Sequence, residues 1–250
     1  MVDQAQSPFA GVVLLDAATN GTNYYTADFD NDGDVDVLGV SNTTGPAYLY
    51  RNNNGVSTRE TASGFNGTQF GVRLVVGDFN GDGAADILYQ PGTVDSANPW
   101  RYAQNNGNGT FTDMVQAASP FASFSLSPYS TFNYRVVDFE GDGDLDILYV
   151  ANNSSPILYR NTGGVFTQVA TNAPAATFGG RTIWGDFDGD GDADLFWQVG
   201  ANGTDWNYAT NNGDGTFSTV ARSASPFAGL TMVDFGFTNF RTGDFDGDGD

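Results

Sequence analysis

Short apolar runs alternate with polar, glycine-rich turns along the whole chain, and this pattern predicts β-strands. Runs such as "RLVVGDF" (73–79) and "ADILYQP" (85–91) are short and rich in branched and aromatic side chains. Such runs, bounded by Gly, Asn and Asp, are typical of strands. The stretch "YAQNNGNGTF" (102–111) adds a hairpin signal. No stretch of useful length has helical periodicity, so we expect an all-β protein.

The same order of strands recurs along the chain behind an aspartate-rich loop. The first aspartates of these loops are residues 28, 78, 138, 186 and 244, which gives spacings of 50, 60, 48 and 58. Repeats of this length indicate a propeller or a solenoid. We therefore predict one domain over residues 1–250, built from units of four strands. The complete units span roughly 23–62, 73–117, 133–170 and 181–222.

The units alternate between two kinds. The tetrapeptide "SPFA" occurs at 7–10, 119–122 and 225–228, before every second loop, and "PWRYAQNNGNGTF" (99–111) matches "DWNYATNNGDGTF" (205–217). The duplicated element is therefore a pair of units. Segment 1–7 aligns with the last strand of one kind of unit, and the partial unit at 239–250 is the beginning of a unit of the other kind. We expect either a fragment of a ring of six or eight units, or self-association through the incomplete units.

The composition is acidic without being that of a disordered tail. The net charge is −21, yet 40% of residues are hydrophobic and 14% are aromatic, which is enough for a sizeable core. This charge disfavours nucleic acid and anionic membranes as partners. Cysteine and histidine are absent, and no apolar run approaches the ~18 residues of a membrane span. We expect a secreted or cell-surface protein of bacterial origin, without membrane insertion.

The aspartate loops concentrate like charges that need a cation. The first, "ADFDNDGDVD" (27–36), has an aspartate at every second position. Two carboxylates about 5 Å apart repel by roughly 3 kcal/mol at an effective dielectric of 20. Counted from its first aspartate, each loop has oxygen-bearing side chains at residues 1, 3 and 5 and glycine at residue 6. Calcium takes six to eight hard oxygen ligands, and a glycine allows the sharp turn around the ion.

Two loop positions refine this assignment. Loop residue 7 is alanine in one copy, so a backbone carbonyl is the ligand there, whereas loop residue 9 is aspartate in every complete copy. We predict four complete Ca²⁺ sites and a fifth, incomplete one. The predicted ligand positions are Asp28, Asp30, Asp32, Asp34 and Asp36 (loop 1); Asp78, Asn80, Asp82, Ala84 and Asp86 (loop 2); Asp138, Glu140, Asp142, Asp144 and Asp146 (loop 3); Asp186, Asp188, Asp190, Asp192 and Asp194 (loop 4); and Asp244, Asp246, Asp248 and Asp250 (loop 5).

Other readings of the loops explain less. Solvated Asp/Gly turns would account for one loop, but not for five in register with glycine fixed at residue 6. An EF-hand would need flanking helices and a glutamate at loop residue 12. Transition metals would need imidazole or thiolate ligands.

The loop "DFDGDGDAD" (186–194), an apolar strand and then "YATNNGDGTF" (208–217) together resemble the FG-GAP/VCBS repeats of integrin-α-like calcium β-propellers. The resemblance implies four-stranded antiparallel blades, with a structural calcium loop between the first two strands of each: four full blades plus partial ones. It places the ligands on the side chains of loop residues 1, 3, 5 and 9 and the carbonyl of residue 7. Glu140 departs from the pattern, and we expect it to distort the third site.

We expect a non-catalytic module for adhesion, or for recognition of a glycan or an extracellular protein. Trp100 and Tyr102, like Trp206 and Tyr208, are two residues apart and so share a strand face. With the neighbouring asparagines they would suit a sugar. The alternative is packing between blades, which a tyrosine in every blade (Tyr50, Tyr102, Tyr159, Tyr208) favours. The SPFA loops, one with Tyr129 and Phe132, are a second candidate surface, again with packing as the alternative.

The enzyme alternative is the propeller part of a polysaccharide lyase or glycoside hydrolase. The chain has no histidine, lysine or cysteine for base or nucleophile chemistry. A glycosidase needs two carboxylates about 5–10 Å apart, and no spacing outside the loops nominates a pair. A self-assembling structural protein of the cell surface is a further alternative.

Overall fold

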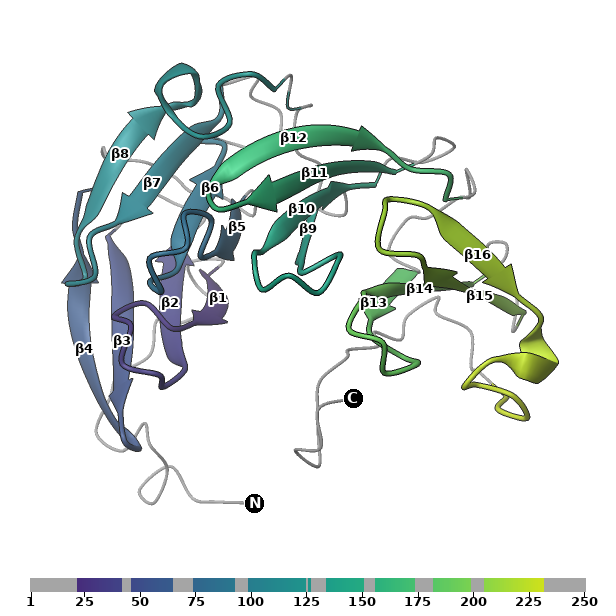
Figure 1. The fold of residues 1–250 in the computed structure, drawn as a ribbon. Coiled ribbons are helices and arrows are strands. Elements are labelled where there is room, and N and C mark those ends of the chain that lie inside the picture. Colours follow the sequence, from purple (N-terminus) through teal and green to yellow (C-terminus); the bar gives the residue numbers. More distant parts are fainter. Residues whose placement is uncertain are drawn as a thin grey trace. The chain divides into compact units, whose positions relative to one another are not determined.

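The computed structural model describes residues 22–41, 46–64, 74–92, 99–124, 126, 134–150, 156–173, 182–198 and 205–231. These residues form an all-β protein of four antiparallel sheets with four strands each (Figure 1). In every sheet the strands follow one another in chain order, as successive hairpins do. The described residues contain no α-helix, only short 3₁₀ turns. None of the described helical segments is long and apolar enough to cross a membrane.

The chain divides into two compact units. The first unit contains two sheets, made of β1 (Thr22–Ala27), β2 (Asp36–Ser41), β3 (Ala47–Asn53) and β4 (Val56–Ala62), and of β5 (Leu74–Gly77), β6 (Asp86–Tyr89), β7 (Arg101–Asn105) and β8 (Phe111–Val115). The second unit contains the bulk of the other two, made of β9 (Tyr134–Val137), β10 (Asp146–Tyr149), β11 (Ile157–Thr162) and β12 (Val165–Ala170), and of β13 (Thr182–Gly185), β14 (Asp194–Gln198), β15 (Trp206–Asn211) and β16 (Phe217–Val220). The predicted strand order is confirmed in all four.

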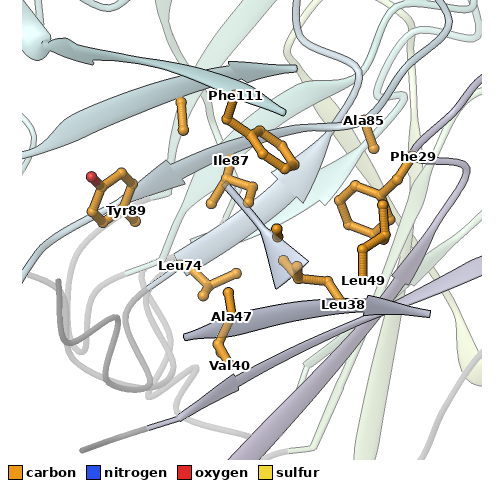
Figure 2. Close-up of a cluster of buried hydrophobic side chains, with 12 residues drawn as sticks. Phe29, Leu38, Val40, Ala47, Leu49, Leu74, Ala85, Ile87, Tyr89 and Phe111 are labelled. Carbon is orange, nitrogen blue, oxygen red and sulfur yellow. The ribbon is translucent and has the colours of Figure 1, made fainter. Parts of the chain in front are cut away.

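The core of the first unit lies between its two sheets. Figure 2 shows Phe29 of loop 1 and Leu38 and Leu49 of the first sheet in one cluster with Ile87 and Phe111 of the second sheet. These five side chains are almost completely buried. Removing a large apolar side chain from water contributes about 1.5–3 kcal/mol, so this cluster is a major stabilising contact of the unit. The backbone also joins the sheets, because the Phe111 N–H donates to the Ser63 carbonyl at 2.8 Å.

The second unit repeats this arrangement with its own side chains. Phe139 of loop 3 and Leu148 of the unit's first sheet form a buried cluster with Leu195, Trp197 and Phe217 of the unit's second sheet. The Phe139 and Phe217 rings meet edge to face, with centroids 5.5 Å apart. The sequence predicted a duplicated pair of unlike four-stranded repeats. In the structure, the two sheets formed by such a pair pack together within one compact unit.

The SPFA segments of both units pack against their own sheets. Phe121, fully buried after the 3₁₀ helix η2 (Gln116–Ala118), contacts the Phe79 and Tyr102 rings at centroid distances of 5.7 and 5.6 Å. Phe227, in the equivalent place after η3 (Arg222–Ala224), lies 4.8–5.8 Å from the rings of Phe187, Phe196, Trp206 and Tyr208. This supports the packing alternative for these segments.

Several predicted features lie outside the described residues. They are the N-terminal strand at 1–7, the first SPFA copy at 7–10, the long-loop residues Tyr129 and Phe132, the partial blade at 239–250, and loop 5 with Asp244, Asp246, Asp248 and Asp250.

Candidate metal sites

Each of the four described aspartate loops joins the first two strands of a sheet. In loop 1 the last residue of β1, Ala27, pairs with Asp36, which is loop residue 9 and the first residue of β2. The other loops have the same register, with Gly77 opposite Asp86, Val137 opposite Asp146 and Gly185 opposite Asp194. The loop position that the resemblance implied is therefore observed in all four sheets.

The backbone of the loops turns where the sequence predicts. Loop residue 6 has a φ between +89° and +97° in each of the four described loops, a conformation that favours glycine. These residues are Gly33, Gly83, Gly143 and Gly191. The N–H of each donates to a carboxylate oxygen of loop residue 1 at 2.7–2.9 Å. The first aspartate thus closes the turn with one oxygen, and the turn holds that carboxylate in place.

Loop residue 9 is a completely buried aspartate that accepts two backbone hydrogen bonds. Asp36 accepts from the N–H of Phe29 at 3.0 Å and from the N–H of Asn52 at 2.7 Å. The other sheets repeat the pair, with donors Phe79 and Asn105, Phe139 and Asn161, and Phe187 and Asn211. This residue therefore ties the loop to the third strand, a role that the sequence analysis missed. The signal for it was the asparagine that recurs at the end of every third strand.

Carboxylate oxygens gather closely in two of the described loops. Asp28, Asp30 and Asp36 of loop 1 each have an oxygen within 4.8 Å of the others. Asp186, Asp188 and Asp190 of loop 4 form a second such group. All six offer hard oxygen donors, which suit Ca²⁺ or Mg²⁺ rather than a soft metal.

Buried oxygens without a partner support the fit of a cation. Asp30 Oδ1 and Glu140 Oε2, both at loop residue 3, are buried and accept no hydrogen bond. A buried acceptor left unsatisfied costs about 1–3 kcal/mol. The other oxygen of each residue forms an ion pair, with Arg51 at 3.1 Å and with Arg160 at 2.6 Å. These arginines lie on the third strands of the two sheets concerned, and no motif in the sequence pointed to them.

Several carboxyl groups of the loops have raised pKa values, so their ionised forms are disfavoured in the folded chain. Burial raises the pKa of Asp36 to about 6 and that of Asp86 to about 7. Burial, and secondarily the charge of neighbouring aspartates, raises the pKa of Asp30 and Asp188. Burial also raises the pKa of Glu140. A bound cation would remove this penalty, because opposite charge favours the ionised carboxylate.

The predicted aromatic platform is not exposed. Trp100 is 2% exposed and Trp206 is 3% exposed, and Tyr102 and Tyr208 are buried as deeply. Phe196 and Phe227 cover the Trp206 ring at centroid distances of 5.1 and 5.7 Å. Burial of all four rings supports the packing alternative over a sugar platform.

The third-strand tyrosines belong to two different positions. Counted back from the asparagine that donates to loop residue 9, Tyr102 and Tyr208 lie three residues earlier, whereas Tyr50 and Tyr159 lie two residues earlier. The two kinds therefore point to opposite faces of their strands. Only the first kind bonds the buried aspartate among the described contacts: Tyr102 donates to Asp86, and Tyr208 donates to Asp194.

A family model described as FG-GAP-like repeat matches residues 28–89, 138–197 and 186–250. Each matched stretch begins at the first aspartate of a loop, namely loops 1, 3 and 4. No curated protein matches the sequence.

Two solved structures are similar to the chain. A lectin of Agrocybe aegerita that recognises non-reducing terminal N-acetylglucosamine aligns with 85% of this chain and 54% of its own, at 22% identity and a TM-score of 0.59. A rhamnogalacturonan lyase of Bacillus licheniformis aligns with 78% of this chain and 42% of its own, at 17% identity and a TM-score of 0.39. The chain thus spans about half the length of the lectin, and the likeness to the lectin shows a shared fold.

Proposed function

Because the chain belongs to the FG-GAP-like repeat family, we propose that it is an extracellular, calcium-stabilised β-propeller module. It binds a glycan or an extracellular protein and catalyses no reaction. The observation that carries the proposal is the loop geometry: a closed turn in all four described loops, converging carboxylates in loops 1 and 4, and buried oxygens without partners in loops 1 and 3.

The proposed calcium ligands are the loop residues named from the sequence. In loop 1 these are Asp28, Asp30, Asp32 and Asp36 through their side chains and Asp34 through its carbonyl; loops 2, 3 and 4 follow the same scheme. A bound ion supplies charge compensation and cross-links the first two strands of its sheet. Asp28 has one oxygen fixed by the Gly33 N–H, and this bond orients the carboxylate before any ion binds. Asp36, held by two backbone donors, fixes the opposite end of the loop.

The role of the ion is structural in this proposal. The ligand oxygens of each loop would surround one ion and leave no position open for a substrate, as a catalytic metal site requires. Calcium therefore acts by stabilising the sheets that carry the recognition surface.

A glycan is the first ligand class to test, because the fold is similar to that of a lectin that recognises a terminal sugar. The lectin's own sugar is a starting point, and its binding residues are not transferred to this chain. A secreted or surface location agrees with this use, since millimolar extracellular calcium fills sites with a Kd of about 10⁻⁴–10⁻³ M.

A glycan array in millimolar calcium, run beside a polysaccharide-degradation assay on the same glycans, tests the proposal. We expect retention without turnover, and loss of retention in EDTA. Release of reducing ends or of unsaturated sugars would instead support the enzyme alternative. Absence of any calcium effect on binding or stability would overturn the proposed role of the loops.

A further inference from the structure

Loops 1 and 2 of the first unit are joined by a buried asparagine. The Asn105 side chain donates to the Phe29 carbonyl of loop 1 at 2.8 Å and to the Ala85 carbonyl of loop 2 at 2.9 Å. Its backbone N–H donates to Asp86 of loop 2 at 2.8 Å. Asn105 is only 2% exposed, so water does not compete for these bonds. One residue therefore fixes the backbone of both loops.

The two loops also touch directly. The Ala85 N–H donates to the Asp28 carbonyl at 2.8 Å, and the Asn31 side chain donates to the Asp82 carbonyl at 3.1 Å. A Cβ added to Gly83 would lie 2.4 Å from the Asn31 side-chain oxygen, so the Asn31 side chain would have to move to admit a larger residue there. A shift in either loop must consequently be followed by the other.

The second unit contains the same connection between loops 3 and 4. The Asn211 side chain donates to the carbonyls of Phe139 and Ala193 at 2.5 and 3.1 Å. A Cβ on Gly141 would lie 2.5 Å from the Gly191 carbonyl oxygen, which repeats the close approach of the first unit. The connection therefore belongs to the duplicated pair of blades and not to one accidental contact.

We propose that Asn105 and Asn211 are positioning residues that join the two loops of each unit into one two-ion calcium centre. Filling one loop then raises the calcium affinity of its partner. The inference rests on the proposed calcium binding and adds coupling between sites. An ion orders the loop that holds it, and the shared hydrogen bonds order part of the neighbouring loop, which then loses less entropy when it binds. By linkage the effect is equal in both directions.

The experiment is a calcium titration monitored by NMR, in which the amide resonance of one glycine reports on each loop. The Gly33 N–H reports on loop 1 and the Gly143 N–H on loop 3, since each donates to the first aspartate of its loop. Asp82→Ala removes a side chain from loop 2, and Asp190→Ala removes the equivalent one from loop 4. Both aspartates are exposed, so the variants should fold.

If the loops of a unit are coupled, each aspartate variant should change calcium binding at the other loop of its own unit and leave the other unit unchanged. Asp82→Ala should raise the calcium midpoint of Gly33 at least fivefold, the low end of typical coupling between sites, and leave that of Gly143 unchanged. Asp190→Ala should do the reverse. Asn105→Ala should reduce the effect of Asp82→Ala on Gly33, and the direct contacts between the loops would carry what remains. Asn52→Ala is the matched control, because the Asn52 side chain donates to Val35 of its own loop and should leave the coupling intact.

The possible results separate coupling between the loops from its absence. Unchanged Gly33 and Gly143 midpoints in the aspartate variants would refute the coupling while leaving calcium binding in place. Equal shifts of both glycines would indicate a general loss of stability and would also refute it. If neither resonance responds to calcium in the unmodified chain, the proposed calcium binding itself is wrong. Should Asn105→Ala fail to fold, the comparison of Asp82→Ala with Asp190→Ala still decides.

Discussion

The Tyr102 hydroxyl donates a hydrogen bond to Asp86 Oδ2 at 2.5 Å, where both side chains are buried inside the second sheet. Asp86 also accepts two backbone N–H groups, so the hydroxyl is its third donor. Burial and the Asp86 charge raise the pKa of Tyr102 above its usual value, which keeps the hydroxyl protonated. The same pair occurs as Tyr208 and Asp194 in the fourth sheet.

Replacing Tyr102 with phenylalanine should therefore lower stability while keeping the ring. Hydrogen bonds to charged groups contribute about 1.5–3 kcal/mol, and we expect a loss of this size in urea unfolding above pH 7, where Asp86 is ionised. Tyr48→Phe serves as the control, because the Tyr48 ring lies beneath Arg59 at the surface of the first sheet. Equal losses in the two variants would show that the bond to Asp86 contributes nothing of its own.

Loop residue 9 should matter for folding even without calcium. Asp86→Asn places an amide NH₂ among three donors, so at least one buried donor loses its acceptor; the expected cost is about 3 kcal/mol. Asp82→Asn, at an exposed position of the same loop, should leave stability in EDTA nearly unchanged and lower calcium affinity. Unfolding measured in EDTA separates the two, and a harmless Asp86→Asn would argue against its role as an anchor.

Calcium should stabilise the chain by mass action. One site filled at a hundredfold excess over Kd adds about 2.7 kcal/mol, and in a chain of this length that raises Tm by roughly 5 °C or more. Thermal melts in EDTA and in millimolar calcium provide the measurement, with magnesium at equal concentration as the control. Superimposable melts would contradict the assignment of the loops.

Within loop 4, Asp188→Ala should weaken calcium binding more than Asp192→Ala. Asp188 belongs to the group of three converging carboxylates, whereas Asp192 stands where Ala84 suffices in loop 2. Burial and the nearby Asp190 charge raise the pKa of Asp192, so its removal also relieves repulsion. Isothermal titration of both variants is the test, and equal losses of affinity would overturn the ligand scheme.

The SPFA phenylalanines should behave as core residues. Phe121→Ala removes a completely buried ring from its contacts with Phe79 and Tyr102, and such truncations cost about 3–5 kcal/mol. Val115→Ala, at a position that is 51% exposed, should cost little. If Phe121→Ala were as mild as Val115→Ala and instead abolished ligand binding, the segment would be a recognition surface.

The sequence alone determined the repeating parts of this protein. Strands, hairpins and loops are set by neighbours in the chain: alternating apolar runs, glycine at loop residue 6, and aspartates spaced two residues apart. All four complete loops have the predicted turn, with Gly33 and its equivalents at positive φ. The pairing of unlike blades also followed from sequence, because the spacing of the SPFA motifs records the duplication.

Tertiary structure alone decided which of these residues are buried and what they contact. Trp100 and Tyr102 fit a sugar platform by spacing, but both side chains are buried, and Phe121 of the SPFA segment packs against the Tyr102 ring. The bond from Asn105 to Phe29 spans 76 residues, and no local pattern encodes such a partner. Periodicity fixes which side of a strand a residue faces, whereas the packing of a second sheet or loop fixes whether that side meets water, another ring or a neighbouring loop.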